Sequence, residues 1–403
     1  MYKPELLAPA GSFDKLKTAF HFGADAVYLG GKNFSLRSYA DNFDFDQMKQ
    51  AVEYAHSIGK RVYVTTNIFP SNRDFGELRE YMKYLESIKV DATLLTDPGL
   101  IALTKQVAPN LPIHISTQAN ITNQYTAKFW QNQGAERVVL ARELSLDEIK
   151  QIKDYCDGLQ IECFIHGALC ISYSGRCLLS SYLTDRDSNR GECVQACRWQ
   201  YKLTEVSRTD PLEIEEDERG SYILNSSDLN MLTHIDDLKK AGIDSFKIEG
   251  RMKTVYYVAN VVNAYRRAID LVNPTKEQLA VLDKEMYKCK NRGYSTGFYY
   301  GKENANVTYS KEQKTDGYSF TAVVLEKVEN GYLVEMRNRF KVGDKLEILS
   351  SGDDFGKIFE VKSIRDTKGN EVLDAKLVQQ KLIITPTQKV ELYPDDILRK
   401  QII

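Results

Sequence analysis

The chain has 403 residues, of which 42% are hydrophobic and 27% are charged, and its formal net charge is −2. This length allows one large and one small domain, and no apolar run approaches the ~20 residues of a membrane span. The balanced charge lowers the expectation of a nucleic-acid partner without excluding one, since a local basic patch can exist in a neutral total. No signal pattern precedes the first strand-like segment, so we expect a cytoplasmic protein with no membrane partner.

Eight short, continuously apolar segments are predicted to be parallel strands that are buried on both faces. They are residues 6–8, 26–29, 62–65, 92–95, 113–116, 138–141, 161–165 and 246–249. Amphipathic helices are expected between most of them. The helices that we predict are residues 13–22, 45–58, 75–88, 146–156 and 229–240, with Ser12, Ser145 and Asp228 preceding three of them in positions typical of N-caps.

A weak repeat supports this alternation. Gly23, Gly134 and Gly242 each follow a predicted helix, and each is followed by an acidic residue and then a strand. Glycine commonly ends a helix in the left-handed conformation. The repeat therefore indicates three similar connections, each from the end of a helix to the start of a strand.

This pattern predicts a (β/α)8 TIM-like barrel over residues 1–309. A doubly wound open sheet is the alternative, but no G-x-G-x-x-G follows the first strand. From residue 317 to 403 the pattern changes to strands separated by turns, which predicts a small C-terminal β-barrel after a linker at 310–316. Its predicted strands are 320–327, 332–337, 345–349, 358–364, 381–384 and 390–393.

Four cysteines form a block with the spacing C-x6-C-x15-C-x3-C: Cys170, Cys177, Cys193 and Cys197. They lie in the long connection after the seventh strand, on the catalytic face of such a barrel. Four thiolates can hold either an iron–sulfur cluster or zinc, and spacing alone does not choose between them. A cysteine can also be a buried structural residue that binds no metal. We favour this interpretation for the three cysteines outside the block, Cys156, Cys163 and Cys289.

Polar residues that follow the strands are predicted to meet at the mouth of the barrel. They are Asn67, Gln118, Asn120, Arg142, His166, Glu249, Arg251 and Lys253. Amide, guanidinium and imidazole groups together suit an anionic, oxygen-rich ligand. No H-E-x-x-H, G-x-S-x-G or P-loop pattern is present, and a cysteine-protease pair of His166 and Cys170 is only weakly indicated.

The segment from Glu162 to Ser180 resembles the signature of the collagenase-like peptidase family, peptidase family U-32. Glu162, Phe164, Gly167, Cys170, Gly175, Cys177 and Ser180 occupy the positions of that pattern. The opening Pro4-Glu5-Leu6-Leu7-Ala8-Pro9-Ala10-Gly11, Gly191-Glu192-Cys193 with Cys197, and Lys247-Ile248-Glu249-Gly250-Arg251-Met252-Lys253 are also similar to the family.

The resemblance implies an oxygen-independent hydroxylase with a 4Fe-4S cluster on Cys170, Cys177, Cys193 and Cys197. One branch with this arrangement comprises tRNA hydroxylation proteins, which make 5-hydroxyuridine at the wobble position with prephenate as the implied oxygen donor. The tRNA anticodon loop and prephenate are therefore the expected partners, and a paralogous partner protein stays open. The alternatives are a collagenase-like peptidase, a hydroxylase of another RNA such as a ribosomal RNA cytidine, and a non-catalytic barrel that is stapled by zinc.

Within this hypothesis the site residues take three roles. His166, Glu249 and Arg251 are the candidate catalytic residues, and the four cysteines are the metal ligands. The candidate substrate-binding residues are Asn67, Gln118, Asn120, Arg142, Lys253 and Arg198. Arg176, Arg190, Arg198 and Trp199 are expected on the rim, where they would contact phosphates and stack on bases.

Overall fold

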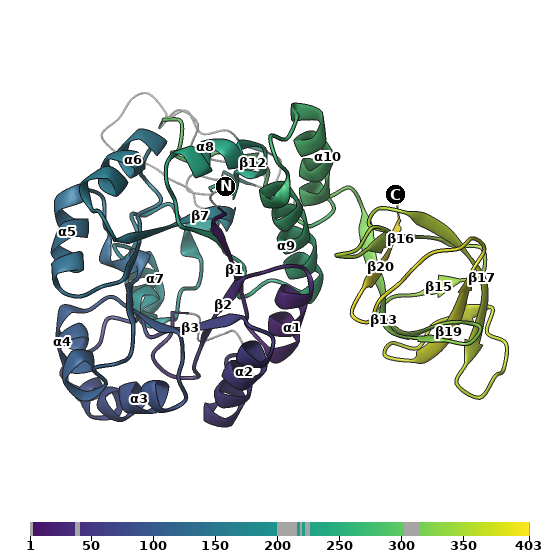
Figure 1. Cartoon of the computed structure of the whole chain (residues 1–403), viewed down its shortest axis with the longest axis horizontal. Helices are drawn as coiled ribbons and strands as arrows, with labels where there is room; N and C mark the ends of the chain where they lie inside the picture. Colours follow the sequence, from purple (N-terminus) through teal and green to yellow (C-terminus); the bar gives the residue numbers. More distant parts are fainter. Residues whose placement is uncertain are drawn as a thin grey trace.

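The computed structural model describes residues 3–36, 41–199, 226–301 and 314–402, together with two short strands, β8 (Glu216–Asp217) and β9 (Gly220–Ser221). Two bodies are visible: a ring of helices around a central sheet, and a smaller β domain that lies beside α9 and α10 (Figure 1). Among the helices of the described residues, none combines the length and apolar character needed to cross a membrane.

The larger body is a closed barrel of eight parallel strands, as predicted. Its order is β1-β2-β3-β4-β5-β6-β7-β11, and β11 pairs with both β7 and β1. This closure excludes the open-sheet alternative. The strands are β1 (Glu5–Pro9), β2 (Ala26–Gly30), β3 (Arg61–Thr65), β4 (Ala92–Leu95), β5 (Ile113–Ile115), β6 (Arg137–Val139), β7 (Gln160–Ala168) and β11 (Ser245–Ile248).

Helices surround this barrel because each has one apolar face to bury against the strands. They are α1 (Phe13–His21), α2 (Phe45–Ser57), α3 (Phe75–Ser87), α4 (Pro98–Val107), α5 (Gln124–Asn132), α6 (Leu146–Tyr155), α8 (Ile235–Lys240) and α9 (Val255–Asp270). The predicted capping box of Ser145 and Glu148 is present at α6. The three repeat glycines all have positive φ, at 101°, 76° and 77° for Gly23, Gly134 and Gly242.

The helix predicted at 229–240 is wrong in its first half. Asp228–Asn230 forms strand β10, which runs antiparallel to the end of β7, and the helix begins at Ile235. The cause is the length of β7, whose nine residues leave an edge beyond the barrel that β10 pairs with. Asp228 accordingly accepts a hydrogen bond from Arg292 Nε (3.0 Å) instead of capping a helix.

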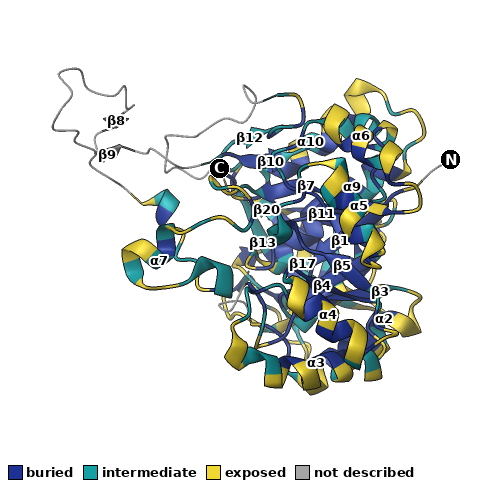
Figure 2. Ribbon diagram, turned by 90° about the vertical axis from the view of Figure 1, so that its left-hand side faces the viewer, coloured by how far each residue is buried: buried dark blue, intermediate teal, exposed yellow. Residues whose placement is uncertain are grey.

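The connection after β7 carries a short helix, α7 (Leu179–Thr184), and two 3-10 turns, η3 (Ser188–Arg190) and η4 (Ala196–Arg198). Helix α7 stands out from the barrel (Figure 2); Tyr182 and Leu183 are exposed, while Ser180 is buried. The acidic stretch at 213–218 lies, apart from the backbone of β8, outside the described residues.

The C-terminal domain is a closed antiparallel barrel, as predicted, in the order β13-β14-β19-β17-β16-β20. Its strands are β13 (Tyr318–Val328), β14 (Gly331–Met336), β16 (Lys345–Leu349), β17 (Ile358–Asp366), β19 (Lys381–Pro386) and β20 (Ile397–Gln401), with the small pair β15 (Phe340–Lys341) and β18 (Asp374–Ala375). The strand predicted at 390–393 is wrong. Val390 and Leu392 are buried and pack in the core of the domain, which gives this segment the alternating pattern of a strand. The barrel is completed by β20, which pairs with β13 and β16.

Helix α10 (Lys276–Tyr287) and α9 hold the two domains together. Arg399 of β20 is fully buried between Asn260 of α9 (2.7 Å), Glu285 of α10 (2.6 Å) and Glu347. Asn263 of α9 also donates to the Ser350 carbonyl oxygen at 3.1 Å. Most of the predicted linker at 310–316, and the predicted domain end at 309, lie outside the described residues.

Candidate functional site

Two adjoining cavities lie at the end of the barrel where the strands finish. The outer cavity has a volume of about 500 Å³ and the inner one about 50 Å³. Leu36, Gln118, Arg142 and Glu249 line both, so the two cavities share a wall formed by these four residues. We call them the outer chamber and the inner chamber.

All four cysteines of the block line the outer chamber. They are free thiols: Cys170 is exposed, and Cys177, Cys193 and Cys197 are half-buried. Burial raises the pKa of the Cys197 thiol, and the charges of the other three thiols act in the same direction, while Arg198 opposes them.

Local contacts hold the cysteine loop in place. Ser188 Oγ and Asn189 Nδ2 donate to the Cys177 carbonyl oxygen at 2.9 and 3.1 Å. Gly175 has a φ of 75°, and a Cβ at that position would clash with the Gln118 carbonyl oxygen. Glycine is therefore required between Cys170 and Cys177 for this loop to pack against the strand-five end of the barrel.

Arg190 joins this loop to the barrel. Its guanidinium donates to both carboxylate oxygens of Asp74 (2.9 and 3.1 Å) and to the Phe69 carbonyl oxygen (2.8 Å). The bond to Arg190 holds the pKa of Asp74 well below its usual range. Both terminal nitrogens of Arg190 thus take part in this anchor, and its contact with phosphates stays a prediction.

The four cysteines are thiolate donors that are distributed around the outer chamber. In the described parts of the chain, no group of three or more His, Cys, Asp or Glu side chains could hold a single metal ion. Four thiolates are a donor set that both iron–sulfur clusters and structural zinc use.

The inner chamber is lined by polar side chains from β2, β3 and β11 and from the segments that follow β3, β5, β6 and β11. Asn67 donates to Ser116 Oγ at 3.1 Å. Arg251 is buried and donates to Ser35, Thr65 and Asn42 at 2.7 to 2.8 Å. The residues that line this chamber are Tyr28, Leu36, Thr65, Asn67, Leu94, Ser116, Thr117, Gln118, Arg142, Phe164, Lys247, Glu249 and Arg251.

Cationic side chains stand in or above both chambers. The Arg142 guanidinium lies 5.1 Å from the Phe164 ring and donates to the Ala168 carbonyl oxygen at 3.3 Å. Lys253 lines the outer chamber, with its ammonium 5.1 Å from the Tyr257 ring. Arg198 lines it too, and burial lowers the pKa of its guanidinium. The mouth is therefore suited to an anionic ligand, as predicted from the strand ends.

Two predicted residues are not brought to the mouth. His166 is buried between the rings of Tyr257, Tyr265 and Tyr294, and it lines neither chamber. Burial lowers its pKa to about 3, so the ring is neutral. Because β7 continues to Ala168, His166 lies within the strand and not after it, and a catalytic role does not fit this position. Asn120 ends a 3-10 turn with φ 56° and also lines neither chamber.

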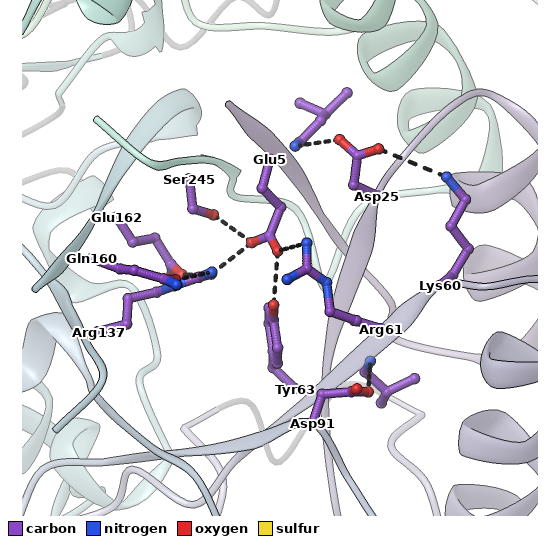
Figure 3. A network of polar contacts seen from close by, with 12 residues as sticks. Glu5, Asp25, Lys60, Arg61, Tyr63, Asp91, Arg137, Gln160, Glu162 and Ser245 are labelled. Carbon is purple, nitrogen blue, oxygen red and sulfur yellow. Dashed lines mark hydrogen bonds and ion pairs between the residues drawn. The ribbon is translucent and has the colours of Figure 1, made fainter. Parts of the chain in front are cut away.

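A buried ionic network inside the barrel was missed at the sequence level (Figure 3). Arg61 and Arg137 bind Glu5 at 2.7 and 2.6 Å, and Arg137 also binds Glu162 at 3.0 Å. Lys247 then binds Glu162 at 2.7 Å and lines the inner chamber. The sequence does contain an indication of this network, because each of these otherwise apolar strands includes a charged residue. A charged side chain is rarely buried unless it has an oppositely charged partner.

The segment that carries the four cysteines exposes aromatic side chains, of which Tyr173 lines the outer chamber. Tyr173, Tyr182 and Trp199 are 52%, 89% and 42% exposed. Arg176 and Arg186 are exposed on the same segment. Such a combination of cations and rings is typical of surfaces on which unpaired bases stack.

Family models match both domains of the chain. The model described as peptidase family U32 matches residues 11–309, and the model of the peptidase family U32 C-terminal domain matches residues 316–399. The chain is 40% identical to tRNA hydroxylation protein P1 of Bacillus subtilis, and the alignment covers 99% of this chain and 95% of that protein.

Two further relatives match a smaller share of the chain. The tRNA hydroxylation protein P2 of Bacillus subtilis is 34% identical, over 74% of this chain and 98% of that protein. The 23S rRNA 5-hydroxycytidine C2501 synthase of Escherichia coli is 37% identical, over 69% of this chain and 41% of that protein. From the two matching family models and these identities, we conclude that the chain belongs to peptidase family U32.

Proposed function

We propose that the protein is a tRNA-modifying enzyme that hydroxylates a wobble uridine to 5-hydroxyuridine without molecular oxygen. It would use a 4Fe-4S cluster and take prephenate as the oxygen donor. The observation that carries this proposal is the outer chamber, where four free cysteines and the cations Arg142, Arg198 and Lys253 line one cavity at the mouth of the barrel.

The cluster assignment is supported by the donor set. Cys170, Cys177, Cys193 and Cys197 would hold the cluster, which supplies one-electron chemistry when bound. Their loop is fixed by the Arg190–Asp74 ion pair and by the bonds to the Cys177 carbonyl oxygen. The chain thus contributes four thiols on a loop that is anchored to the barrel.

The charge of the mouth supports the anionic co-substrate. Arg142, Arg251 and Lys253 surround the chambers, and Glu249 is an acidic group on their shared wall. Cationic groups in a partly desolvated cleft bind carboxylates more strongly than they do in water. Prephenate, a dicarboxylate, matches this arrangement, and in this proposal Glu249 accepts a proton.

The rim supports an RNA substrate. A base in a stacked anticodon loop could not reach the chamber, so the target base must turn out of the stack. Arg198 lines the outer chamber, and Arg176 and Trp199 are exposed on the same segment; in this proposal they contact the phosphates and the neighbouring bases. We favour tRNA over ribosomal RNA because a relative whose alignment covers 99% of this chain is named for tRNA.

The peptidase alternative has no geometric support in the described residues. A cysteine–histidine pair would need His166 to face Cys170, but His166 lies in the barrel wall with a pKa of about 3 and is absent from the lining of the chamber. It is therefore not in a position to activate a thiol in that chamber.

The first test is the metal content of protein purified without oxygen. We expect about four irons and four sulfides per chain, with a broad visible absorption band, and the loss of both in Cys177→Ala. Cys289→Ala is the matched control, because Cys289 is buried away from the chamber. Nucleoside mass spectrometry should then detect 5-hydroxyuridine in tRNA from cells with the wild-type gene and not from cells with Cys177→Ala. Zinc in place of iron, or modified tRNA in the Cys177→Ala cells, would contradict the proposal.

A further inference from the structure

The inner chamber has the character of a built binding site. It is small, and two of its cations are almost completely buried: Lys247 and Arg251 are each 3% exposed. Asn67, Ser116 and Gln118 add amide and hydroxyl groups, and Arg142 lies on the wall shared with the outer chamber. The three cations outnumber the single acidic group, Glu249.

Lys247 is the end of a chain of alternating charges. The order is Arg61, Glu5, Arg137, Glu162 and Lys247, with successive ion pairs of 2.7, 2.6, 3.0 and 2.7 Å. Both ends of this chain are cations. Arg61 is 48% exposed, so water stabilises that end, whereas Lys247 faces only the inner chamber.

The Lys247 ammonium has capacity for another acceptor. It carries three N–H bonds, and among the described residues Glu162 is its one hydrogen-bond acceptor. Two aromatic faces flank the remaining sides, with ring centres of Tyr28 and Phe164 at 4.4 and 5.4 Å. A buried cation is stabilised when hydrogen-bonding partners satisfy it, so an anion in the chamber would complete the alternation of charges.

The volume restricts what can enter. The inner chamber holds about 50 Å³, while an apolar cavity that takes up benzene measures about 150 Å³. A six-membered ring is therefore too large, but a carboxylate on a slender side chain is small enough. The outer chamber, at about 500 Å³, has room for the remainder of such a ligand beside the cysteines.

We propose that the inner chamber is a carboxylate subsite in which Lys247 binds the carboxylate end of an α-keto acid side chain. Glu162 and Arg137 are positioning residues that hold the Lys247 ammonium at the floor of the mouth. The identity of the ligand rests on the proposed function, because prephenate carries such a side chain on its ring. The subsite orients that ligand with its ring toward the cysteines.

The test measures binding by calorimetry with two probes, prephenate and phenylpyruvate, the second of which keeps the α-keto acid and lacks the ring carboxylate. We expect Lys247→Met to weaken the binding of both probes about 10- to 100-fold, as the loss of a hydrogen bond to a charged group does. Lys150→Met, which removes an exposed lysine on α6, is the control and should bind as the wild type does.

A second variant separates binding from folding. Lys247→Met leaves Glu162 with a buried charge, and the double change Glu162→Gln with Lys247→Met removes both charges together. We expect the double variant to regain stability in thermal unfolding and still to bind weakly.

Four outcomes are distinguishable. If Lys247→Met and the double variant both lose affinity for the probes, the subsite is supported. If only phenylpyruvate binds and its binding depends on Lys247, the subsite is supported and the prephenate part of the proposed function fails. If a folded Lys247→Met protein binds both probes within twofold of wild type, the subsite is overturned while the proposed function stands. If wild-type protein binds neither probe, the subsite is overturned as well.

Discussion

At the scale of single residues, the barrel is notable for charges inside its apolar lining. Burial by itself would raise the pKa of Glu5, but the charges of Arg137 and Arg61 and the Tyr63 hydroxyl outweigh it, so the pKa lies below its usual value of 4.5. The same pairing raises the pKa of the Arg137 guanidinium above its usual range. These charges remain ionised in the interior because each has an oppositely charged partner.

This depressed pKa predicts a specific dependence of stability on pH. A carboxyl group with a lower pKa in the folded state stabilises the fold above the unfolded pKa, and this contribution is lost as the pH falls through the folded pKa. The free energy of unfolding of the wild type should therefore drop as the pH is lowered below about 4.5.

We expect Glu5→Gln to be less stable at pH 7, by about 3 to 5 kcal/mol, because Arg137 loses a buried partner. It should also lose less stability between pH 5 and pH 3, which urea unfolding at several pH values would measure. Glu53→Gln is the control, since Glu53 is 65% exposed and forms only a surface pair. Parallel acid profiles for wild type and Glu5→Gln would show that Glu5 does not carry this effect.

At the scale of elements, the long connection after β7 contributes most of the lining of the outer chamber. It carries α7, η3, η4 and all four cysteines, and it is held to the barrel by Arg190 bonding to the segment before α3. Loops that carry functional residues need such anchors, because they contribute few buried contacts of their own.

The anchor gives a second prediction. Arg190→Met and Asp74→Asn should each reduce the iron retained per chain by at least half, while the free energy of unfolding changes by less than about 1 to 2 kcal/mol, because Arg190 is 28% exposed and its pair is partly screened. Metal analysis after gel filtration measures the first quantity and urea unfolding the second.

Arg73→Met is the matched control, as Arg73 is exposed beside Asp74. Full iron retention in both anchor variants would mean that the loop is held by other contacts.

At the scale of the whole molecule, the two barrels are joined by buried polar groups. Arg399 is completely buried against Glu285 and Asn260 of the larger body and Glu347 of its own domain, and Lys288 binds Glu347 at 2.6 Å. A buried, hydrogen-bonded set of this kind restricts the orientation of the two parts more than an apolar contact would. The C-terminal barrel is thus held beside α9 and α10 in one arrangement (Figure 1).

Replacing this arginine should uncouple the domains. Arg399→Met leaves Glu285 and Glu347 buried with one cation fewer, and we expect a loss of about 3 to 5 kcal/mol in unfolding free energy. Unfolding followed by two probes, one in each domain, should change from one shared transition to two. Arg339→Met, which removes an exposed pair with Asp374, should keep the single transition. A single unshifted transition in Arg399→Met would show that other contacts dominate the interface.

The sequence by itself determined the architecture and the location of the site. Periodic apolar segments, helix caps and glycine C-caps are local signals, so all eight barrel strands and the C-terminal barrel were predicted from them. The cysteine spacing likewise placed the candidate metal ligands after the seventh strand. The errors arose where a segment such as Asp228–Asn230 pairs with a distant strand edge, which no local pattern encodes.

The tertiary structure alone decided which polar residues share a cavity. His166 and Lys247 both belong to the segments that resemble the family. His166 nevertheless packs against Tyr265 of α9, whereas Lys247 lines the inner chamber. That difference depends on how far β7 extends and on which face of the closed sheet each side chain occupies. Closure of the barrel brings Glu5, Arg137, Glu162 and Lys247 together from four strands, and long-range contacts of this kind follow from packing and not from sequence order.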